Sequence, residues 1–349
     1  MTNTAGKQKL RFDHTAIWVE DMDKTVSFLT DIVGWRRHPM VVEVSEDDPT
    51  VGGMHAVFVD ANGLWLEMIL PTSEGPGMDI LRQVGDGAIV EINFEPENYE
   101  AVLEDMRARN IPMFNMDGSP LGEDGGRIEE GVAGVEGTHE TGQRIAYWST
   151  DTSCGTTVEI YELIKEDETN LLNIREKQWE EEYKSPTGPR MSHISIVVAD
   201  LEKTASFYTD VMGLKRHPMK FEIDADSNEG IGGLKACFID SNSVFLELFQ
   251  PTGPGPLMDI LNEKGDGYVA ELIAEVDDIG AYFDEVKAKG VHMVGLDGKP
   301  LDENEKCIVL QPHGDKIAYF PADVSRGLSI EIIERGPKET SVMHQLHGA

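Results

Sequence analysis

An internal duplication constrains the fold of this 349-residue chain more than any other feature. The segment FDHTAIWV near the start returns as MSHISIVV, which places His14 and His193 179 residues apart. Three glutamates return at spacings of 180, 180 and 172 residues: Glu67 with Glu247, Glu91 with Glu271, and Glu159 with Glu331. Because internal repeats are structural units, we expect two copies of one architecture, and the chain length allows each copy its own core.

Each half is predicted to have the element order β-α-β-β-β, twice over. Helices are expected over 20–34 and 199–213, since both segments begin with acidic residues and end at glycine. Two more are expected over 98–110 and 278–290, whereas 71–80 and 251–260 are predicted to be Pro/Gly-rich connectors. The fold class is therefore α+β with four βαβββ modules. The expected organisation is a first domain over 8–165, a linker over 166–189, a second domain over 190–335 and a C-terminal tail over 336–349.

The halves differ most between residues 117 and 147, where the first half has about eight extra residues rich in glycine and acid. We expect a surface loop there that acts as a lid over one site.

The charge balance excludes some partners. With 30 basic and 64 acidic side chains, the formal charge of −34 argues against nucleic acids and anionic membranes. The N-terminus lacks a signal-peptide core, and no apolar stretch is long enough for a membrane span. The three cysteines have no ligand-like spacing, which fits a reducing compartment. The sequence therefore predicts a soluble cytoplasmic protein, a monomer or homodimer, that acts on a small molecule.

The duplicated histidines and glutamates suggest a repeated metal site. Hard divalent cations prefer oxygen ligands, often with an imidazole. An isolated carboxylate in an apolar strand such as LWLEMIL costs several kcal/mol unless it is paired or metal-bound. Taken singly, each position is explained as well by an outward-facing glutamate or a packed histidine. The candidate metal ligands are all eight duplicated residues: His14, Glu67, Glu91, Glu159, His193, Glu247, Glu271 and Glu331.

The strand-one histidines, the LWLEM and VFLEL strands, and the IAYW and IAYF elements followed by VEI and IEI carry a family resemblance. The chain resembles the vicinal oxygen chelate superfamily of glyoxalases, bleomycin-resistance proteins and extradiol dioxygenases. The resemblance implies that two modules pair into a U-shaped mixed sheet around a divalent metal, with one ligand from the first and one from the last strand of each module. It also implies that a metal-bound glutamate, Glu159 or Glu331, can leave the ion and act as the base.

The resemblance leaves the pairing of modules open. Pairing within halves would join His14, Glu67, Glu91 and Glu159. Exchanged pairing would join His14 and Glu67 with Glu271 and Glu331. Either set contains one histidine and three glutamates, where many relatives have a second histidine. Such a hard, anionic ligand set suits Mn, Mg, Fe, Co, Ni or Zn acting as a Lewis acid. It disfavours the oxygen-activating chemistry of the extradiol dioxygenases.

The leading functional hypothesis is an epimerase or isomerase. A divalent ion with open positions can chelate a hydroxyketone and stabilise the enediolate formed when the α-proton is removed. Tandem four-module relatives include the 2-epi-5-epi-valiolone epimerases, which act on a cyclitol ketone. His55 corresponds to Lys235 in the second half, so we expect His55 to be a catalytic base only in the first site. A surface strand residue explains position 55 equally well.

Three other functions stay open. They are a glyoxalase I-like lyase on a hemithioacetal, an extradiol dioxygenase and a non-catalytic binding protein. A CoA thioester would need basic residues at the pocket mouth, and the candidates are Arg36, Arg37, Lys215 and Arg216. Two further duplicated pairs, His38 with His217 and Glu43 with Glu222, are interpreted as structural.

Overall fold

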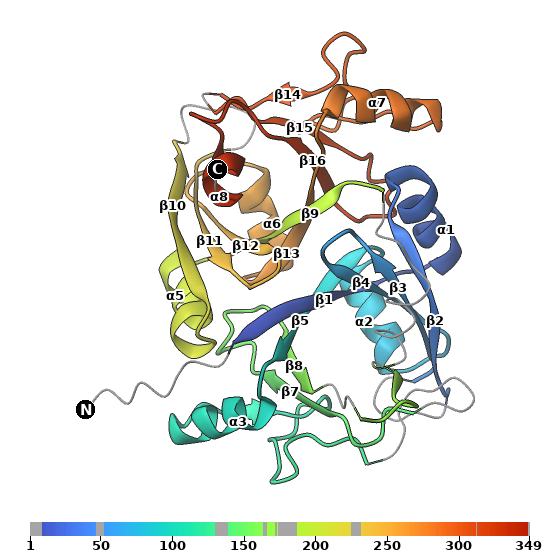
Figure 1. Ribbon diagram of the computed structural model, residues 1–349, viewed down its shortest axis with the longest axis vertical. Coiled ribbons are helices and arrows are strands. Elements are labelled where there is room, and N and C mark those ends of the chain that lie inside the picture. Colours follow the sequence, from blue (N-terminus) through green and yellow to red (C-terminus); the bar gives the residue numbers. More distant parts are fainter. Residues whose placement is uncertain are drawn as a thin grey trace.

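The computed structural model describes residues 9–46, 52–129, 139–162, 166–171, 173, 187–224, 232–311 and 313–347. Two similar halves lie side by side, each built on a curved sheet (Figure 1). The elements of the first half are β1 (Leu10–Trp18), α1 (Met22–Ser27), the π-helical turn η1 (Phe28–Val33), β2 (Arg36–Val44), β3 (Met54–Asp60), β4 (Trp65–Pro71), α2 (Pro76–Val84), β5 (Ala88–Pro96), α3 (Tyr99–Ala108), β6 (Met113–Phe114), β7 (Arg144–Trp148) and β8 (Val158–Glu162).

The second half repeats this order and adds a C-terminal helix. Its elements are β9 (Arg190–Val197), α5 (Leu201–Ser206), η2 (Phe207–Val211), β10 (Lys215–Ile223), β11 (Leu234–Asp240), β12 (Phe245–Pro251), α6 (Pro256–Lys264), β13 (Tyr268–Glu275), α7 (Ile279–Ala288), β14 (Ile308–Val309), β15 (Lys316–Tyr319), β16 (Ile330–Glu334) and α8 (Val342–His347). The predicted α+β class and the four β-α-β-β-β modules are therefore confirmed. Most of the proposed linker lies outside the described residues.

Strand pairing shows that modules associate within each half. β1 pairs in parallel with β4 and antiparallel with β5, and β5 pairs in parallel with β8. β9, β12, β13 and β16 repeat these pairings in the second half. A single residue pair, Val269 with Ile89, joins β13 to β5, so the described strands form one continuous 16-stranded sheet. We call its two curved parts the first cup (β1–β8) and the second cup (β9–β16). The exchanged arrangement of modules is excluded.

The first helix of each half begins and ends as capping physics expects. Asp21 accepts a hydrogen bond from the Lys24 backbone (3.1 Å), and Asp200 accepts one from Lys203 (3.0 Å). In the first half the π-helical turn ends at Gly34, whose φ of 91° requires a residue without a side chain. The helix predicted over 20–34 therefore forms from α1 and η1 together.

The expected connectors contain helices instead. α2 and α6 begin at Pro76 and Pro256, because proline is tolerated in the first helical turn, where its missing N–H has no partner to lose. Both helices end before a glycine, Gly85 and Gly265. The prediction of irregular structure was wrong because the prolines mark helix starts.

The two cups meet through symmetrical glycine contacts. A Cβ on Gly87 would lie 2.5 Å from the Leu328 backbone nitrogen, and one on Gly267 would lie 2.2 Å from that of Thr156. The Thr156 hydroxyl donates to the Gly267 carbonyl at 2.9 Å. The junction is therefore a close backbone-to-backbone contact.

In the part of the chain that the structure describes, no helix is long and apolar enough to cross a membrane.

Candidate active site

Sheet register gathers the candidate residues of the first half on one concave face, the first cup. His14 of β1 lies opposite Asn93 of β5, which lies opposite Glu159 of β8, and Glu159 lies opposite Tyr147 of β7. The strands are adjacent, so these side chains form one row across the sheet.

A second row lies beside the first. Ala16 of β1 is the partner of both Glu67 on β4 and Glu91 on β5. The small alanine leaves space between the two carboxylates. The structure thus brings together His14, Glu67, Glu91 and Glu159, the set expected for pairing within the first half.

A cavity of about 570 Å³ opens onto these rows. Its wall contains His14 and the three glutamates together with apolar side chains from β1, β2 and β3, such as Trp18, Val42 and Phe58. This size is typical of a small-molecule site. No lysine or arginine is among the described residues that line it.

The carboxylates in the cavity hold protons more tightly than exposed ones. Burial, followed by the charge of Glu67, raises the pKa of Glu91. Burial, followed by the charge of Glu91, raises the pKa of Glu159. With its amide nitrogen turned toward them, Asn93 donates to Glu91 Oε1 (2.6 Å) and Glu159 Oε1 (3.0 Å). The two carboxyl groups are thus held close to one another, which is costly unless a proton or a cation lies between them.

A β-bulge orients His14. Phe12 and His14 pair with successive residues of β5, so Asp13 is the extra residue of the bulge. Its buried carboxylate Oδ2 lies 2.9 Å from His14 Nδ1, which directs Nε2 toward Glu67 Oε2 at 3.7 Å. A histidine that ligates a metal generally has its second nitrogen held in this way by a carboxylate or a carbonyl group.

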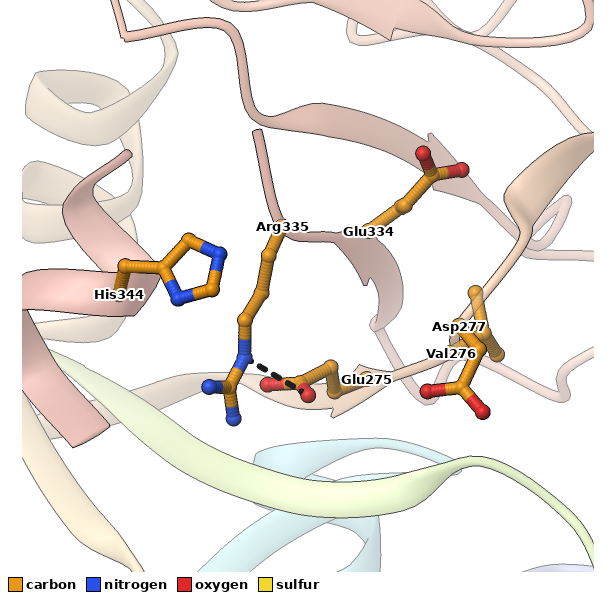
Figure 2. Close-up of a pocket in the computed structure, with 6 residues that line it drawn as sticks. All are labelled: Glu275, Val276, Asp277, Glu334, Arg335 and His344. Carbon is orange, nitrogen blue, oxygen red and sulfur yellow. Dashed lines mark ion pairs between the residues drawn. The ribbon is translucent and has the colours of Figure 1, made fainter. Parts of the chain in front are cut away.

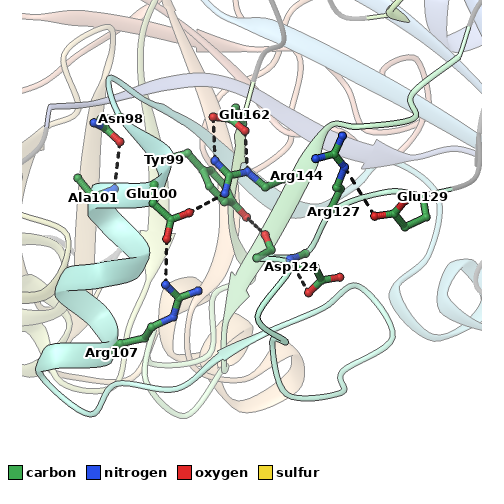
Figure 3. A network of polar contacts seen from close by, with 12 residues as sticks. Asn98, Tyr99, Glu100, Ala101, Arg107, Asp124, Arg127, Glu129, Arg144 and Glu162 are labelled. Atoms are coloured by element: carbon green, nitrogen blue, oxygen red, sulfur yellow. Dashed lines mark hydrogen bonds and ion pairs between the residues drawn. The ribbon is translucent and has the colours of Figure 1, made fainter.

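Polar contacts fix the hairpin that carries Glu159. The Tyr147 hydroxyl donates to Glu159 Oε2. Outside the cup, Arg144 of β7 donates to Glu162 of β8 and to Glu100 of α3, both at 2.6 Å (Figure 3). These ion pairs tie β7 and β8 to the covering helix and so position Tyr147 and Glu159.

The second half repeats both rows as the second cup. His193 lies opposite Ile273, Ile273 opposite Glu331, and Ser195 between Glu247 and Glu271. Burial raises the pKa of Glu247 to about 8 and lowers that of His193 to about 3. Glu247 Oε2 lies 3.1 Å from His193 Nε2. Burial, followed by the charges of Glu247 and Glu271 respectively, raises the pKa values of Glu271 and Glu331.

The cups differ in two of the residues that hold the ligands. Ser192 stands where the first cup has Asp13, and its hydroxyl contacts His193 Nδ1 at 2.9 Å. Ile273 stands where the first cup has Asn93. The second cup therefore lacks the carboxylate beside the histidine and the amide between the carboxylates.

His55 does not reach either cup. Strand alternation places it on the outer face of β3, opposite the face on which Met54 and Phe58 line the cavity. Its half-exposed ring lies 3.5 Å from Glu43, and Lys235 similarly lies 3.6 Å from Glu222. The geometry contradicts the prediction that His55 is a base in the site.

The other duplicated pairs and the basic candidates also lie away from the ligands. His38 and His217 each accept a backbone hydrogen bond from the methionine two residues later, which is a structural role. Arg216 is held by Glu202 (2.6 Å). None of the four basic candidates lines the first cavity.

Among the polar residues that line the first cavity, sequence reasoning missed Tyr147, Asn93 and Glu140. Tyr147 and its counterpart Tyr319 stand in the repeated IAYW and IAYF motifs, so their register was visible in the sequence. Asn93 has no polar counterpart, and Glu140, in the Gly- and acid-rich segment between residues 117 and 147, corresponds to Pro312. Burial, followed by the charge of Glu67, raises the pKa of Glu140 to about 8. Residues 130–138 of this segment lie outside the described residues.

The side chains of His14, Glu67, Glu91 and Glu159 are of the types that bind a divalent cation, although they do not surround a common point in the structure. Within the described residues, no three histidine, cysteine, aspartate or glutamate side chains stand in an arrangement that could hold a metal ion. Their chemistry nevertheless fits, since burial and the charge of Glu67 raise the pKa of Glu91, burial and the charge of Glu91 raise that of Glu159, and the imidazole is oriented by Asp13.

Fold and site together define a protein with two glyoxalase-like cups, one of which opens into a cavity lined by carboxylates. The sequence model of the Glyoxalase/Bleomycin resistance protein/Dioxygenase superfamily matches residues 11–115 and 190–314, and the chain belongs to that superfamily.

Two curated relatives are epimerases. The ethylmalonyl-CoA/methylmalonyl-CoA epimerase of Cereibacter sphaeroides is 31% identical over 144 residues, which are 41% of this chain and 96% of the relative. The mitochondrial methylmalonyl-CoA epimerase of Mus musculus is 28% identical over 123 residues, and the match spans 32% of this chain and 63% of that enzyme. A mutant of 4-hydroxymandelate synthase from Streptomyces coelicolor superimposes with a TM-score of 0.59 at 14% identity over 96% of this chain and 98% of that one, which shows a shared fold.

Proposed function

We propose that the first cup is the active site of a divalent-metal-dependent epimerase or isomerase that removes and returns a proton next to a carbonyl group. The observation that carries this proposal is the convergence of three glutamates and an aspartate-oriented histidine on the wall of one cavity. The epimerase names of the two curated relatives support the same reaction class.

In this proposal His14, Glu67, Glu91 and Glu159 hold the cation. When bound, a divalent cation supplies Lewis-acid stabilisation of the negative charge that develops on a carbonyl oxygen during proton removal. Asp13 keeps the imidazole in the tautomer that presents an unprotonated Nε2 to the cavity. Asn93 and Tyr147 hold the carboxylates of Glu91 and Glu159 by hydrogen bonds, so little reorganisation is needed during the reaction.

Glu159 is the proposed proton-transfer group, because it lies on the last strand and has a hydrogen-bond partner that fixes it. Inversion of a stereocentre also requires a proton donor on another side of the substrate. Glu140 is proposed for that role in place of His55, since it lines the same cavity and its pKa is raised to about 8. A carboxyl group with a pKa near the working pH can donate and accept protons efficiently.

The cavity favours an uncharged hydroxyketone, such as a cyclitol or another sugar-like ketone, over the acyl-CoA esters in the names of its relatives. Four glutamates and no cationic side chain are among the described lining residues. Phosphate or carboxylate groups of a ligand would therefore find no positive partner among them.

The test is solvent deuterium incorporation into a panel of hydroxyketones and methylmalonyl-CoA, measured with the full chain and added Mn²⁺. Glu159→Gln should lower the exchange rate by about 10²–10⁴-fold, which is the usual contribution of a general acid–base group. The matched variant Glu331→Gln changes the same position of the second cup and should leave the rate unchanged. Oxygen uptake with catechols, or turnover of methylglyoxal with glutathione, without deuterium exchange into any ketone would contradict the proposal.

A further inference from the structure

The C-terminal helix α8 lies inside the concave side of the second sheet (Figure 1). Met343 is 1% exposed and packs against Ile273 of β13, Ile317 of β15 and Ile333 of β16. Leu346, one helical turn later, is also buried. The apolar side of α8 is therefore the side that faces into the second cup.

The positions that contact Met343 correspond to positions that line the cavity of the first cup. Ile273, Ile317 and Ile333 match Asn93, Ile145 and Tyr161 at the spacings of the duplication, 180, 172 and 172 residues. The latter three line the first cavity. Ile317 is 2% exposed, whereas Ile145 is only partly buried. Side chains of α8 thus stand where the first cup has open space.

Polar contacts fasten both ends of this segment. The buried Asp315 accepts hydrogen bonds from the Gly336 backbone (2.7 Å), the Ser341 hydroxyl (2.5 Å) and the Val342 backbone (2.8 Å). At the other end, His347 Nε2 lies 2.8 Å from the hydroxyl of Ser192, next to His193. The His347 ring also packs edge-on against Phe245, with centroids 5.4 Å apart.

The opposite side of α8 faces a shallow polar pocket of about 360 Å³ (Figure 2). His344 projects toward Arg335 there, and the Arg335 guanidinium is held by Glu275 at 2.9 Å. Since these groups are polar and border the pocket, the side of α8 that carries His344 is its polar side.

We propose that α8 is an intramolecular plug that closes the second cup, so that the two duplicated sites are unequal and the second becomes accessible only when the C-terminal segment leaves. Removal of α8 exposes Ile273, Ile317 and Ile333, and with them the row that contains His193 and Glu331. The plug explains why Ile317 is buried whereas Ile145 lines an open cavity, and its test needs neither turnover nor a bound cation.

Thiol labelling tests the plug directly, in a chain whose partly exposed Cys307 is replaced by Ser. Ile317→Cys reports on the second cup, and Ile145→Cys is the matched reporter at the corresponding position of the first. In the full chain Ile317→Cys should react at least about tenfold more slowly than Ile145→Cys, because labelling requires a local opening. In a chain that ends at Gly336, both reporters should react at similar rates.

Equal rates in the full chain would overturn the proposal, and so would slow labelling of Ile317→Cys after truncation. A change in the rate of Ile145→Cys would indicate that the truncated chain has lost its fold. In that case Met343→Asn replaces the truncation, with Gln345→Asn on the exposed side of α8 as its control. Only Met343→Asn should then accelerate labelling of Ile317→Cys, and acceleration by neither or by both variants contradicts the plug.

Counting bound Mn²⁺ separates this inference from the proposed function. The full chain should bind one ion and the chain that ends at Gly336 two, and Glu247→Gln in the shortened chain should remove the second. Two ions in the full chain would show that α8 does not close the cup. If no form binds Mn²⁺, the proposed metal function fails, while the labelling result still decides whether α8 is a plug.

Discussion

The contact between Asp13 and His14 should determine how tightly the first cup binds a divalent cation. The Asp13 side chain is inaccessible to solvent, and its Oδ2 lies 2.9 Å from His14 Nδ1. Charge-assisted hydrogen bonds between buried groups contribute about 1.5–3 kcal/mol. Loss of such a partner lowers metal affinity by about 10–100-fold, which corresponds to about 1.4–2.8 kcal/mol.

Two substitutions separate the contribution of the Asp13 charge from that of its hydrogen-bond acceptor. Asp13→Asn keeps an oxygen that can accept from Nδ1–H but removes the charge, so we expect about tenfold weaker binding. Asp13→Ala also removes the acceptor and frees the imidazole to rotate, so we expect about 100-fold. The assay is calorimetric titration with Mn²⁺ after dialysis against a chelator, with thermal unfolding to verify that each variant is folded.

Arg11 provides the control. It pairs with Asp13 at 2.9 Å and with Glu95 at 2.7 Å, so loss of Asp13 also alters this ion pair. Glu95→Gln perturbs Arg11 without removing the partner of His14 and should leave Mn²⁺ affinity unchanged. If Asp13→Ala binds Mn²⁺ as tightly as the unmodified chain, or Glu95→Gln weakens binding equally, the orienting role of Asp13 is refuted.

Two further predictions concern stability. In the presence of a chelator, the free energy of unfolding should fall between about pH 5 and pH 9. The pKa of Glu247 is raised, so in this range the folded state binds more protons than the unfolded state. The stabilisation is complete below the pKa of an exposed glutamate and is lost as the pH rises through about 8. In urea titrations Glu247→Gln should reduce that fall, whereas Glu222→Gln at an exposed position should not. At the junction of the cups, Gly267→Ala should lower the free energy of unfolding by about 2–4 kcal/mol, since its Cβ would lie 2.2 Å from a backbone nitrogen. Gly265→Ala has a similar φ and nothing within 4 Å, so it should cost only about 1–2 kcal/mol of backbone strain.

The sequence was sufficient to predict the module order because the periodic patterns and the duplication agree with one another. Strand alternation alone places Ala16 and Trp18 on the face of His14, and Ile17 and Val19 on the opposite face, and the structure has them in these two separate clusters. These are local relations, which depend only on the geometry of one strand. Predictions of this kind need no knowledge of the partner strands.

The pairing of modules depended on strand contacts between distant segments, so local pattern left it open. His14 and Glu159 belong to one cup only because β5 lies between β1 and β8. His55 shows the opposite error. Alternation along β3 places His55 on the same face as Val57 and Val59, which is the outer face of the sheet. The sequence therefore contained the information that excludes His55 from the cavity.

The inequality of the two cups lies furthest from what sequence patterns reveal. Residues 336–349 were predicted to be a tail, yet the segment SVMHQLH carries local signs of a helix: a serine at its start and apolar side chains at Met343 and Leu346, one turn apart. Six residues cannot form a stable helix alone, so α8 forms because Asp315 fastens its start and the second cup receives its apolar side. A duplication shows which side chains can converge, whereas the segment that covers one copy decides which copy is accessible.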